Sequence, residues 1–428
     1  MLTPAQIRVR GQKLHAALDV VIEQRGWSTP KRRAHQWRSL KAVVRHAYDQ
    51  VPLYQRLFAG AGFTPAMLDD WADLTKLPIL TKHQLRNATE RDLITSANRD
   101  EVRWLASSGS TGIPARIARS ASSLWHYMAC NTALFYDWCG GKPVSNGLNL
   151  VDMAPDSIDY AAADLLRTLV PDKRLLSVHD PVAKLTHVVL SIAPEFISSY
   201  PSTLRAIALD LRARNRVISQ TRLIHLTSET LDAHTRHLLG RVFRNARLIE
   251  TYTSTEGGLV AFQCMHDNRW HIAESNVICE IVDADGQPTD GLGQIVITDL
   301  TNTATPILRY CGLGDLARWE PTPCPCGSSL RSIRQLEGRS AAMLRTRGGI
   351  LLSPLCDHQR HRGSPRPSTV SSRAKTAGHA GSPCCHRQRH AAVSDRERHQ
   401  SRPLQRCRER HGDSHPIRSC HCRTAWFA

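Results

Sequence analysis

The chain lacks any apolar run close to the ~20 residues that a membrane-spanning helix needs. Its N-terminus, Met1-Leu2-Thr3-Pro4, also lacks the basic stretch followed by an apolar one that marks a secretory signal. We therefore expect no membrane partner and a location in the cytoplasm. The cysteine count is odd, at 13, and no short secreted framework accompanies it, which favours free thiols and metal ligands over a disulfide lattice.

The composition itself is that of a globular protein. Hydrophobic residues make up 41% and charged residues 22% of the 428 residues, which is enough apolar material for a large core and two or three domains. A peptide hormone, a toxin and a lone DNA-binding module are excluded by this size and composition. No internal repeat is present, and no pattern bears on the oligomeric state.

Residues 356–428 differ from the rest of the chain. They hold 15 Lys and Arg against 5 Asp and Glu, so they carry +10 of the net charge of +18, and they show no hydrophobic period that could build a core. A basic, disordered arm that binds nucleic acid is one interpretation. Coding DNA read out of frame is the other, and the 6 Cys and 9 His of this segment, without an aromatic stacking pattern, favour it. Nucleic acid is therefore not the expected partner.

Before this tail, apolar residues follow the period of a helix. Leu40, Val43, Val44 and Ala47 recur at helical spacing, and Val51-Pro52 ends the run, which predicts an amphipathic helix. Short helices are expected to follow through Leu93.

Strand-like and helical segments then alternate, which indicates an α/β sheet. Strands are expected at 102–105, 147–151, 196–200, 223–226 and 248–252, with a helix at 202–214. The segments 277–282 and 294–298 flank Asp285-Gly286 and predict an antiparallel hairpin.

The first segment whose residue types suggest a binding function is Ser107-Ser108-Gly109-Ser110-Thr111-Gly112. Small residues let backbone N–H groups approach phosphate oxygens, and the hydroxyls add further donors. The segment lacks the Gly-Lys-Ser/Thr ending of a P-loop, because Ile113-Pro114-Ala115 follows it. A Ser/Gly-rich linker is the alternative interpretation.

Three later segments make nucleotide chemistry more specific. In the segment 250–258, Tyr252 offers a flat face for a base and Glu256 a hard oxygen ligand for Mg²⁺. In the segment 309–316, Asp315 offers a carboxylate for two ribose hydroxyls, and Arg339 brings a guanidinium in the segment 336–340. Four such segments in this order are difficult to attribute to chance.

From about residue 35 to about residue 354 the chain therefore resembles the adenylate-forming superfamily of acyl-CoA synthetases. The resemblance is greatest to the phenylacetate:coenzyme A ligase-like branch, which includes relatives associated with capsular polysaccharide synthesis. It also rests on Val51-Pro52-Leu53-Tyr54, Leu77-Pro78-Ile79-Leu80-Thr81-Lys82, Ser199-Tyr200-Pro201-Ser202-Thr203-Leu204 and Thr227-Ser228-Glu229-Thr230-Leu231.

The resemblance implies an architecture. Residues 1–337 would form the large N-terminal domain, with α/β subdomains and a small β-barrel-like part. Residues 338–355 would be a hinge remnant, and residues 356–428 the basic tail. The normal small C-terminal domain of the family, with its adenylation-assisting lysine, would be missing.

The resemblance also implies site residues and a reaction. Thr255 would contact the α-phosphate and Glu256 would hold Mg²⁺. A substrate carboxylate would attack the α-phosphate of ATP to form acyl-AMP and pyrophosphate, and CoA would then take the acyl group, although an amine or a carrier-protein thiol could replace CoA. The nucleotide-binding set comprises Ser107, Ser108, Gly109, Ser110, Thr111 and Gly112 at the β/γ-phosphates, Tyr252 against adenine, Asp315 with Arg339 at ribose, and also Ser228, Glu229, Thr253 and Ser254.

Two interpretations stay open beside this one. Ser228 and Glu229 fall where the branch has an adenine-side loop, but a surface turn is an equal alternative. The whole chain could also be a catalytically silent protein that binds nucleotide and zinc and uses its basic tail to dock on nucleic acid or an acidic partner.

Four residues outside the nucleotide motifs suggest a metal site. Cys264, His271 and the pair Cys324 and Cys326 form a Cys₃His set suited to tetrahedral Zn²⁺, and the resembling branch often carries this arrangement. A closed set of this kind stabilises structure and does not catalyse. His266 competes with His271 as the fourth ligand, and buried free thiols are the alternative. Cys130, Cys139 and Cys279 are expected to be small core residues.

Overall fold

The N-terminal third folds into helices whose ends follow local sequence. A computed structural model describes residues 4–94, 102–107, 114–141, 146–161, 173–339, 344–345 and 351–352. The predicted helix around Leu40 is α2 (Thr29–Gln50), and all four of its predicted apolar positions are buried. The Ser28 side chain accepts a hydrogen bond from the Lys31 amide and caps the helix, which ends at Val51 before Pro52.

The other described helices are α1 (Pro4–Arg25), α3 (Pro52–Ala61), α4 (Lys82–Asn87), α5 (Glu90–Leu93), α6 (Ala121–Trp138), α8 (Val182–Ile192), α9 (Pro201–Ala213) and α10 (Ala233–Val242), with short 3-10 helices η1 (Pro65–Met67) and η2 (Trp71–Lys76). The strands are β1 (Val102–Ala106), β2 (Arg116–Ser120), β3 (Gly147–Val151), β4 (Lys173–Ser177), β5 (Phe196–Ser199), β6 (Leu223–Leu226), β7 (Arg247–Ser254), β8 (Gly258–Gln263), β9 (Trp270–Ile272), β10 (Val277–Val282), β11 (Gly293–Asp299), β12 (Asp315–Glu320), β13 (Ser332–Arg339), β14 (Leu344–Arg345) and β15 (Leu351–Leu352). The predicted strands and the helix at 202–214 are confirmed to within a few residues.

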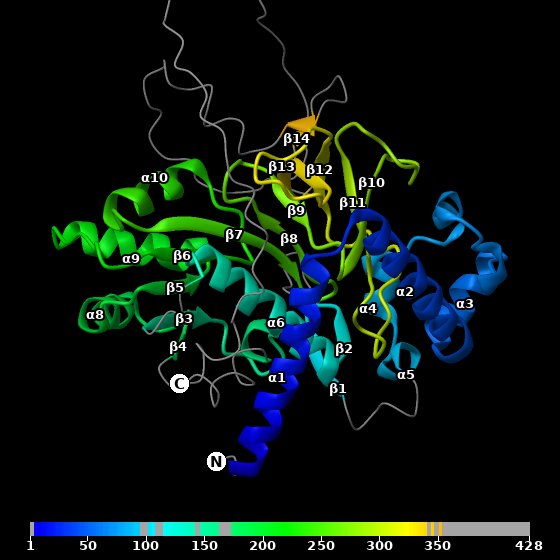
Figure 1. The fold of residues 1–428 in the computed structure, drawn as a ribbon, viewed down its shortest axis with the longest axis horizontal. Coiled ribbons are helices and arrows are strands. Elements are labelled where there is room, and N and C mark those ends of the chain that lie inside the picture. The colour runs from blue at the N-terminus through cyan, green and yellow to red at the C-terminus, as the bar shows by residue number, and fades with distance from the viewer. Residues whose placement is uncertain are drawn as a thin grey trace, which may run out of the picture. The chain divides into compact units, whose positions relative to one another are not determined.

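One sheet of eleven strands runs through the described part of the chain (Figure 1), in the order β10-β11-β12-β13-β9-β8-β7-β6-β5-β3-β4. The strands from β4 to β7 are parallel, as the alternating pattern predicted, and those from β7 to β10 are antiparallel. The predicted hairpin is confirmed, because β10 pairs with β11 from Val277 opposite Asp299 to Val282 opposite Gln294.

Strand β7 belongs to both parts of this sheet. Residues 247–250 pair in parallel with β6, whereas residues 251–254 pair in antiparallel with β8. The chain reverses direction immediately after β7, so the segment that follows it lies where the parallel and antiparallel halves of the sheet meet. This position matters because it holds the motif around Glu256.

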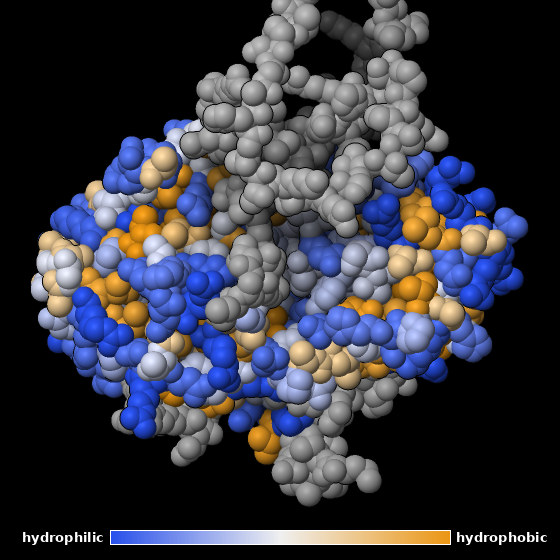
Figure 2. Space-filling model, turned by 180° about the vertical axis from the view of Figure 1, so that it is seen from behind, coloured by the Kyte–Doolittle hydropathy of each residue, from blue (hydrophilic) through white to orange (hydrophobic). Residues whose placement is uncertain are grey.

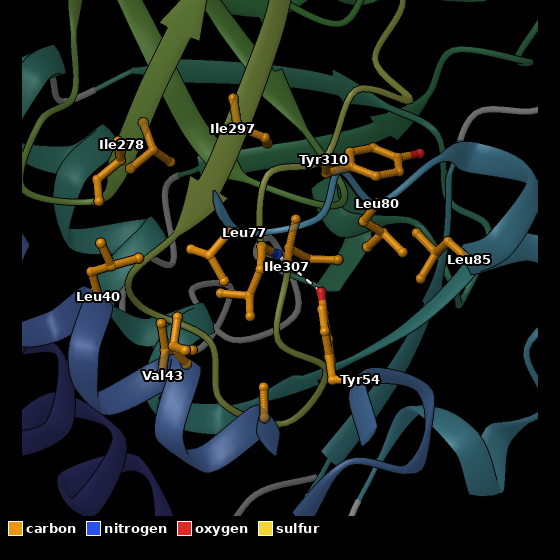
Figure 3. Packing of buried hydrophobic residues seen from close by; sticks show 14 of the residues in the cluster. Leu40, Val43, Tyr54, Leu77, Leu80, Leu85, Ile278, Ile297, Ile307 and Tyr310 are labelled. Atoms are coloured by element: carbon orange, nitrogen blue, oxygen red, sulfur yellow. Dashed lines mark hydrogen bonds between the residues drawn. The ribbon is translucent and has the colours of Figure 1, made fainter. Parts of the chain in front are cut away.

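Three apolar clusters hold the layers together. Helices α8, α9 and α10 pack on one side of the parallel strands, and α6 and α1 pack on the other. The third cluster joins α2, α3 and α4 to β10 and β11, as Figure 3 shows for Leu40, Val43 and Ile278. Within it, the Tyr54 hydroxyl donates to the Pro306 carbonyl at 2.8 Å and accepts from the Leu308 amide at 3.0 Å, so this buried polar group is satisfied.

The surface mixes polar and apolar residues. On the face in Figure 2, hydrophilic side chains separate small groups of hydrophobic ones. Among the described helices, none has the length and apolar content to cross a bilayer. Cys130, Cys139 and Cys279 are buried, which confirms their assignment to the core.

Candidate active site

The turn between β7 and β8 carries the central motif. The Ser254 hydroxyl accepts a 2.8 Å hydrogen bond from the Gly257 amide and closes the turn. Thr255 and Glu256 follow it and are 8% and 5% exposed. A buried carboxylate in a turn is expensive to maintain without partners, so its surroundings define what the turn can do.

Arg119, on β2, is the main support of this turn. Its Nε donates to the Thr255 carbonyl at 2.9 Å, and its Nη2 donates to the Glu256 carbonyl at 2.8 Å. The same Nη2 lies 2.9 Å from Asp299 Oδ2, and neither side chain is exposed. The fully buried ion pair therefore fixes Arg119, which in turn fixes the backbone of the turn.

The candidate phosphate loop begins beside the same turn. Strands β1 and β2 form an antiparallel hairpin on either side of this loop. At the base of the loop, the Ser107 amide donates to the Ala115 carbonyl at 2.8 Å, and Ser107 Oγ accepts from the Ala115 amide at 3.0 Å. The Thr255 hydroxyl donates to the Ala106 carbonyl at 3.4 Å. Residues predicted for the α-phosphate and the β/γ-phosphates thus approach each other. Ser108, Gly109, Ser110, Thr111 and Gly112 lie outside the described residues.

Two predicted nucleotide residues are in direct contact. The Tyr252 hydroxyl donates to Asp315 Oδ2 at 2.6 Å. Asp315 begins β12 and pairs in register with Arg339 of β13, so the predicted adenine and ribose residues share one edge of the site. Burial raises the pKa of Tyr252, and the charge of Asp315 raises it further, so the tyrosine is a protonated donor.

Glu256 is approached by a second tyrosine. The Tyr310 hydroxyl donates to Glu256 Oε1 at 3.0 Å. Burial raises the pKa of Glu256, whereas this hydrogen bond and the charges of Lys82 and Arg119 lower it. A side chain at Gly312 would place its Cβ 2.2 Å from the Tyr310 ring, so glycine is required for the ring to lie against the backbone.

The remaining predicted nucleotide residues lie at the ends of β6 and β7. Thr253 and Thr227 share a 2.9 Å hydrogen bond between their hydroxyls. Ser228 is exposed, and the Glu229 carboxylate accepts from the Ser202 amide and hydroxyl, both at 2.9 Å. The contacts of Glu229 are therefore those of a cap for α9, and a nucleotide role for Ser228 and Glu229 stays a prediction.

The predicted zinc ligands converge at the far end of the antiparallel strands. The ligand atoms of Cys264, His271, Cys324 and Cys326 all lie within 4.8 Å of one another. The sulfurs of Cys264 and Cys324 are 3.5 Å apart, and Cys326 Sγ is 3.3 Å from His271 Nε2. Tetrahedral Zn²⁺, with bonds of about 2.3 Å to sulfur and about 2.0 Å to nitrogen, separates neighbouring ligands by roughly 3.5 Å, so the set fits this metal.

Two backbone amides contact sulfurs of this cluster. The His266 amide points at Cys264 Sγ and the Ser328 amide at Cys326 Sγ, each at 3.4 Å. The cluster contains His271 and not His266, so its geometry favours His271 as the fourth ligand. Burial lowers the pKa of His271, so its imidazole stays neutral and able to bind a metal.

Arg119 is the functional residue that sequence reasoning missed. It stands in the strand sequence Ile117-Ala118-Arg119, and both of its apolar neighbours are buried. A charged residue directly after two apolar ones in a short strand is the signal that could have revealed it, because such a charge, if buried, needs a fixed partner.

No family model matches the chain. Phenylacetate-coenzyme A ligase of Pseudomonas putida is 29% identical to it over 329 residues, which cover 74% of this chain and 72% of that protein. The Thermus thermophilus protein of the same name is 27% identical over 345 residues, with the same two shares. The Escherichia coli protein is 27% identical over 334 residues, covering 75% of this chain and 74% of its own.

Solved structures show the same fold. A crystal structure of 2-hydroxyisobutyryl-CoA ligase in the postadenylation state superposes with a TM-score of 0.66 at 17% identity, over 78% of this chain and 72% of that one. An open conformation of this ligase, with 2-HIB-AMP and CoA, gives a TM-score of 0.64 at 18% identity, over 78% and 80% of the two chains. Together with the motif order, the sequence likenesses support the resemblance to the phenylacetate:coenzyme A ligase-like branch of the adenylate-forming superfamily, and the solved structures show that the fold is that of an acyl-CoA ligase.

Proposed function

We propose that the protein activates a carboxylic acid with ATP to form acyl-AMP and pyrophosphate, and then transfers the acyl group to CoA. The observation that carries this proposal is the convergence of Tyr252, Glu256 and Asp315 on one turn that touches the base of the candidate phosphate loop. The relatives that match most of the chain are named phenylacetate-coenzyme A ligases, which supports the same chemistry.

The residues would act by position and charge. Tyr252 and Asp315 would hold adenosine, and Thr255 would hold the α-phosphate beside the phosphate loop. None of these groups is a nucleophile, so the catalytic effect would come from aligning the carboxylate with the α-phosphate and from neutralising charge. The site would act in the cytoplasm, where ATP is available.

Glu256 is the residue proposed to hold Mg²⁺. Its carboxylate is a hard oxygen ligand, and its burial disfavours an isolated negative charge, so a cation is a fitting partner. When bound, Mg²⁺ would neutralise phosphate charge during attack. The Cys₃His cluster is proposed to hold a structural Zn²⁺ that ties the loop before β9 to the loop between β12 and β13.

Carboxylate-dependent exchange of pyrophosphate into ATP tests the proposal. Wild-type protein should exchange with at least one member of a broad acid panel, and Glu256→Gln should abolish the exchange while the fold stays intact. Glu250→Gln is the matched control, since Glu250 lies in β7, ahead of the turn, and accepts a hydrogen bond from Arg236 at 2.6 Å. Normal exchange in Glu256→Gln would remove Glu256 from the mechanism.

The silent-binding alternative gives a different result in the same assay. Nucleotide binding without exchange for any acid would favour it. Adding CoA after exchange is established shows the acceptor, because thioester should form with CoA itself. Formation of acyl-AMP without thioester would point instead to an amine or a carrier-protein thiol.

A further inference from the structure

Three polar side chains, those of Asp159, Tyr200 and Ser228, meet beside the candidate active site. The Tyr200 hydroxyl donates to Asp159 Oδ2 at 2.8 Å, and the Ser228 hydroxyl donates to the same oxygen at 3.4 Å. Tyr200 follows β5, Ser228 lies just beyond β6, and Asp159 lies in the segment after β3. They therefore gather at the carboxyl ends of parallel strands, the edge where α/β sheets bind ligands.

Short contacts connect this group to the reacting centre. The Asp156 carbonyl, three residues before Asp159, accepts from the Ala106 amide at 2.9 Å, and the carbonyl of Ala106 accepts from Thr255. Thr227, next to Ser228, bonds Thr253. The group thus borders both the base of the phosphate loop and the turn that would hold the α-phosphate, where the acid must lie.

Asp159 has capacity for another donor. Both of its hydrogen bonds fall on Oδ2, and within the described residues no group donates to Oδ1 and no Lys or Arg pairs with the carboxylate. Burial raises its pKa, and so does the charge of Asp152, while Tyr200 and Ser228 oppose the shift. Asp159 and Tyr200 are only partly buried and Ser228 is exposed, so a ligand can reach them. A desolvated carboxylate with one oxygen unbonded gains from a ligand that donates to it.

Tyr127 of α6 lies within reach of the charge of Asp159. Burial raises the pKa of Tyr127 and the charge of Asp159 raises it further, while hydrogen bonds with Asn131 and Thr253 lower it. Gly258 lies so close that a Cβ there would be 3.6 Å from the Tyr127 ring.

We propose that Asp159 selects the substrate, which is a carboxylic acid bearing a hydroxyl or ammonium group that donates a hydrogen bond to Asp159 Oδ1. This inference rests on the proposed function and names the substrate class of the same site. Tyr200 and Ser228 act through Asp159 as positioning residues, because they fix Oδ2 and leave Oδ1 turned to the ligand. An acid without the donor leaves Asp159 unpaired and is rejected.

The test compares acids that differ only in the donor. ATP–pyrophosphate exchange is measured with isobutyrate, 2-hydroxyisobutyrate and 2-aminoisobutyrate, and with phenylacetate and 4-hydroxyphenylacetate. The wild type should prefer the donor-bearing member of at least one set by roughly ten- to a hundredfold in kcat/KM, the effect of a hydrogen bond to a charged group. A preference for the hydroxyl or for the ammonium member distinguishes the two donors.

Asp159→Asn should reduce this preference to a few-fold and Asp159→Ala should remove it, while KM for ATP stays unchanged. Asp156→Asn is the matched control, since Asp156 is exposed and contacts Ala106 only through its backbone. Tyr200→Phe should weaken the preference partially and should not move KM for ATP. Thermal melting of each variant shows whether it is folded.

Equal use of both members of every set by the wild type, or an unchanged preference in Asp159→Asn, would overturn the inference and leave the proposed function intact. Absence of exchange with every acid would count against the proposed function alone. In that case, calorimetric binding of the same acids in the presence of ATP decides the inference: tighter binding of the donor-bearing acid that disappears in Asp159→Asn supports it, and equal binding refutes it.

Discussion

The hydroxyl of Tyr252 donates a 2.6 Å hydrogen bond to Oδ2 of Asp315, 63 positions further along the chain. The pair joins the end of β7 to the start of β12, and so links a residue proposed for adenine to one proposed for ribose. Because a charged acceptor strengthens the bond, each residue restricts the other before any nucleotide arrives. The two halves of the proposed adenosine site are therefore a single preorganised unit.

Tyr252→Phe tests this unit. The variant keeps the ring that would stack on adenine but removes the donor, so Asp315 loses its orientation and KM for ATP should rise roughly tenfold, as expected for one charge-assisted hydrogen bond. The rate at saturating ATP should change much less. Steady-state exchange kinetics measure both values, with Tyr48→Phe as the control in a tyrosine that only stacks on Phe58. An unchanged KM for ATP would show that this hydrogen bond does not contribute to nucleotide binding.

Arg119→Met should destabilise the protein by about 3–5 kcal/mol, because it leaves Asp299 buried without its partner and releases two carbonyls of the turn. Urea unfolding measures the loss. Exchange activity should fall as well, since Thr255 and Glu256 lose their support. Adding Asp299→Asn to Arg119→Met should restore part of the stability but not the activity.

Arg45→Ala provides the comparison for Arg119. Arg45 pairs with Asp49 at 2.8 Å on the exposed side of α2, and loss of such a pair should cost no more than about 0.5 kcal/mol. Equal effects of the two substitutions would contradict the supporting role of Arg119.

Cys324→Ser should lower zinc content and thermal stability together. At free zinc a thousandfold above the dissociation constant, metal linkage supplies about 4 kcal/mol, which this variant should lose. Elemental analysis and thermal melting provide the two measurements. Cys311→Ser is the control, because Cys311 is also a free thiol but is only partly buried and lies outside the cluster. Full zinc occupancy in Cys324→Ser would refute the ligand set.

The stability of zinc-free protein should depend on His271. Burial lowers its pKa in the folded state, so on acidification the unfolded chain takes up the proton first, at about pH 6.5. The contribution of His271 to stability is therefore fully present above pH 6.5 and is lost as the pH falls toward the lower folded-state pKa. The urea midpoint of the wild type should decline between pH 8 and pH 5.5. The decline should be smaller in His271→Gln and unchanged in the control His187→Gln, whose histidine is exposed. If the urea midpoints of wild type and His271→Gln change equally with pH, His271 does not cause the pH dependence of stability.

Local sequence patterns were sufficient to predict much of the fold. The helix carrying Leu40 and the hairpin around Asp285 were predicted correctly, because helical spacing and turn residues act over a few positions. The motif after β7 was also recognisable, because an apolar strand followed by hydroxyl side chains and a carboxylate indicates a strand end that carries polar functional groups.

Only the tertiary structure decided which of these residues meet. Strand β7 pairs with both β6 and β8, and Arg119 contacts the turn that follows β7. His271, but not His266, lies in one cluster with Cys324 and Cys326. Each of these contacts joins segments far apart in the chain. The group formed by Asp159, Tyr200 and Ser228 is equally nonlocal, because it depends on how strands β3, β5 and β6 align. The sequence alone determined the residue types and their order, whereas burial and strand register, which arise from packing of distant segments, determined their partners.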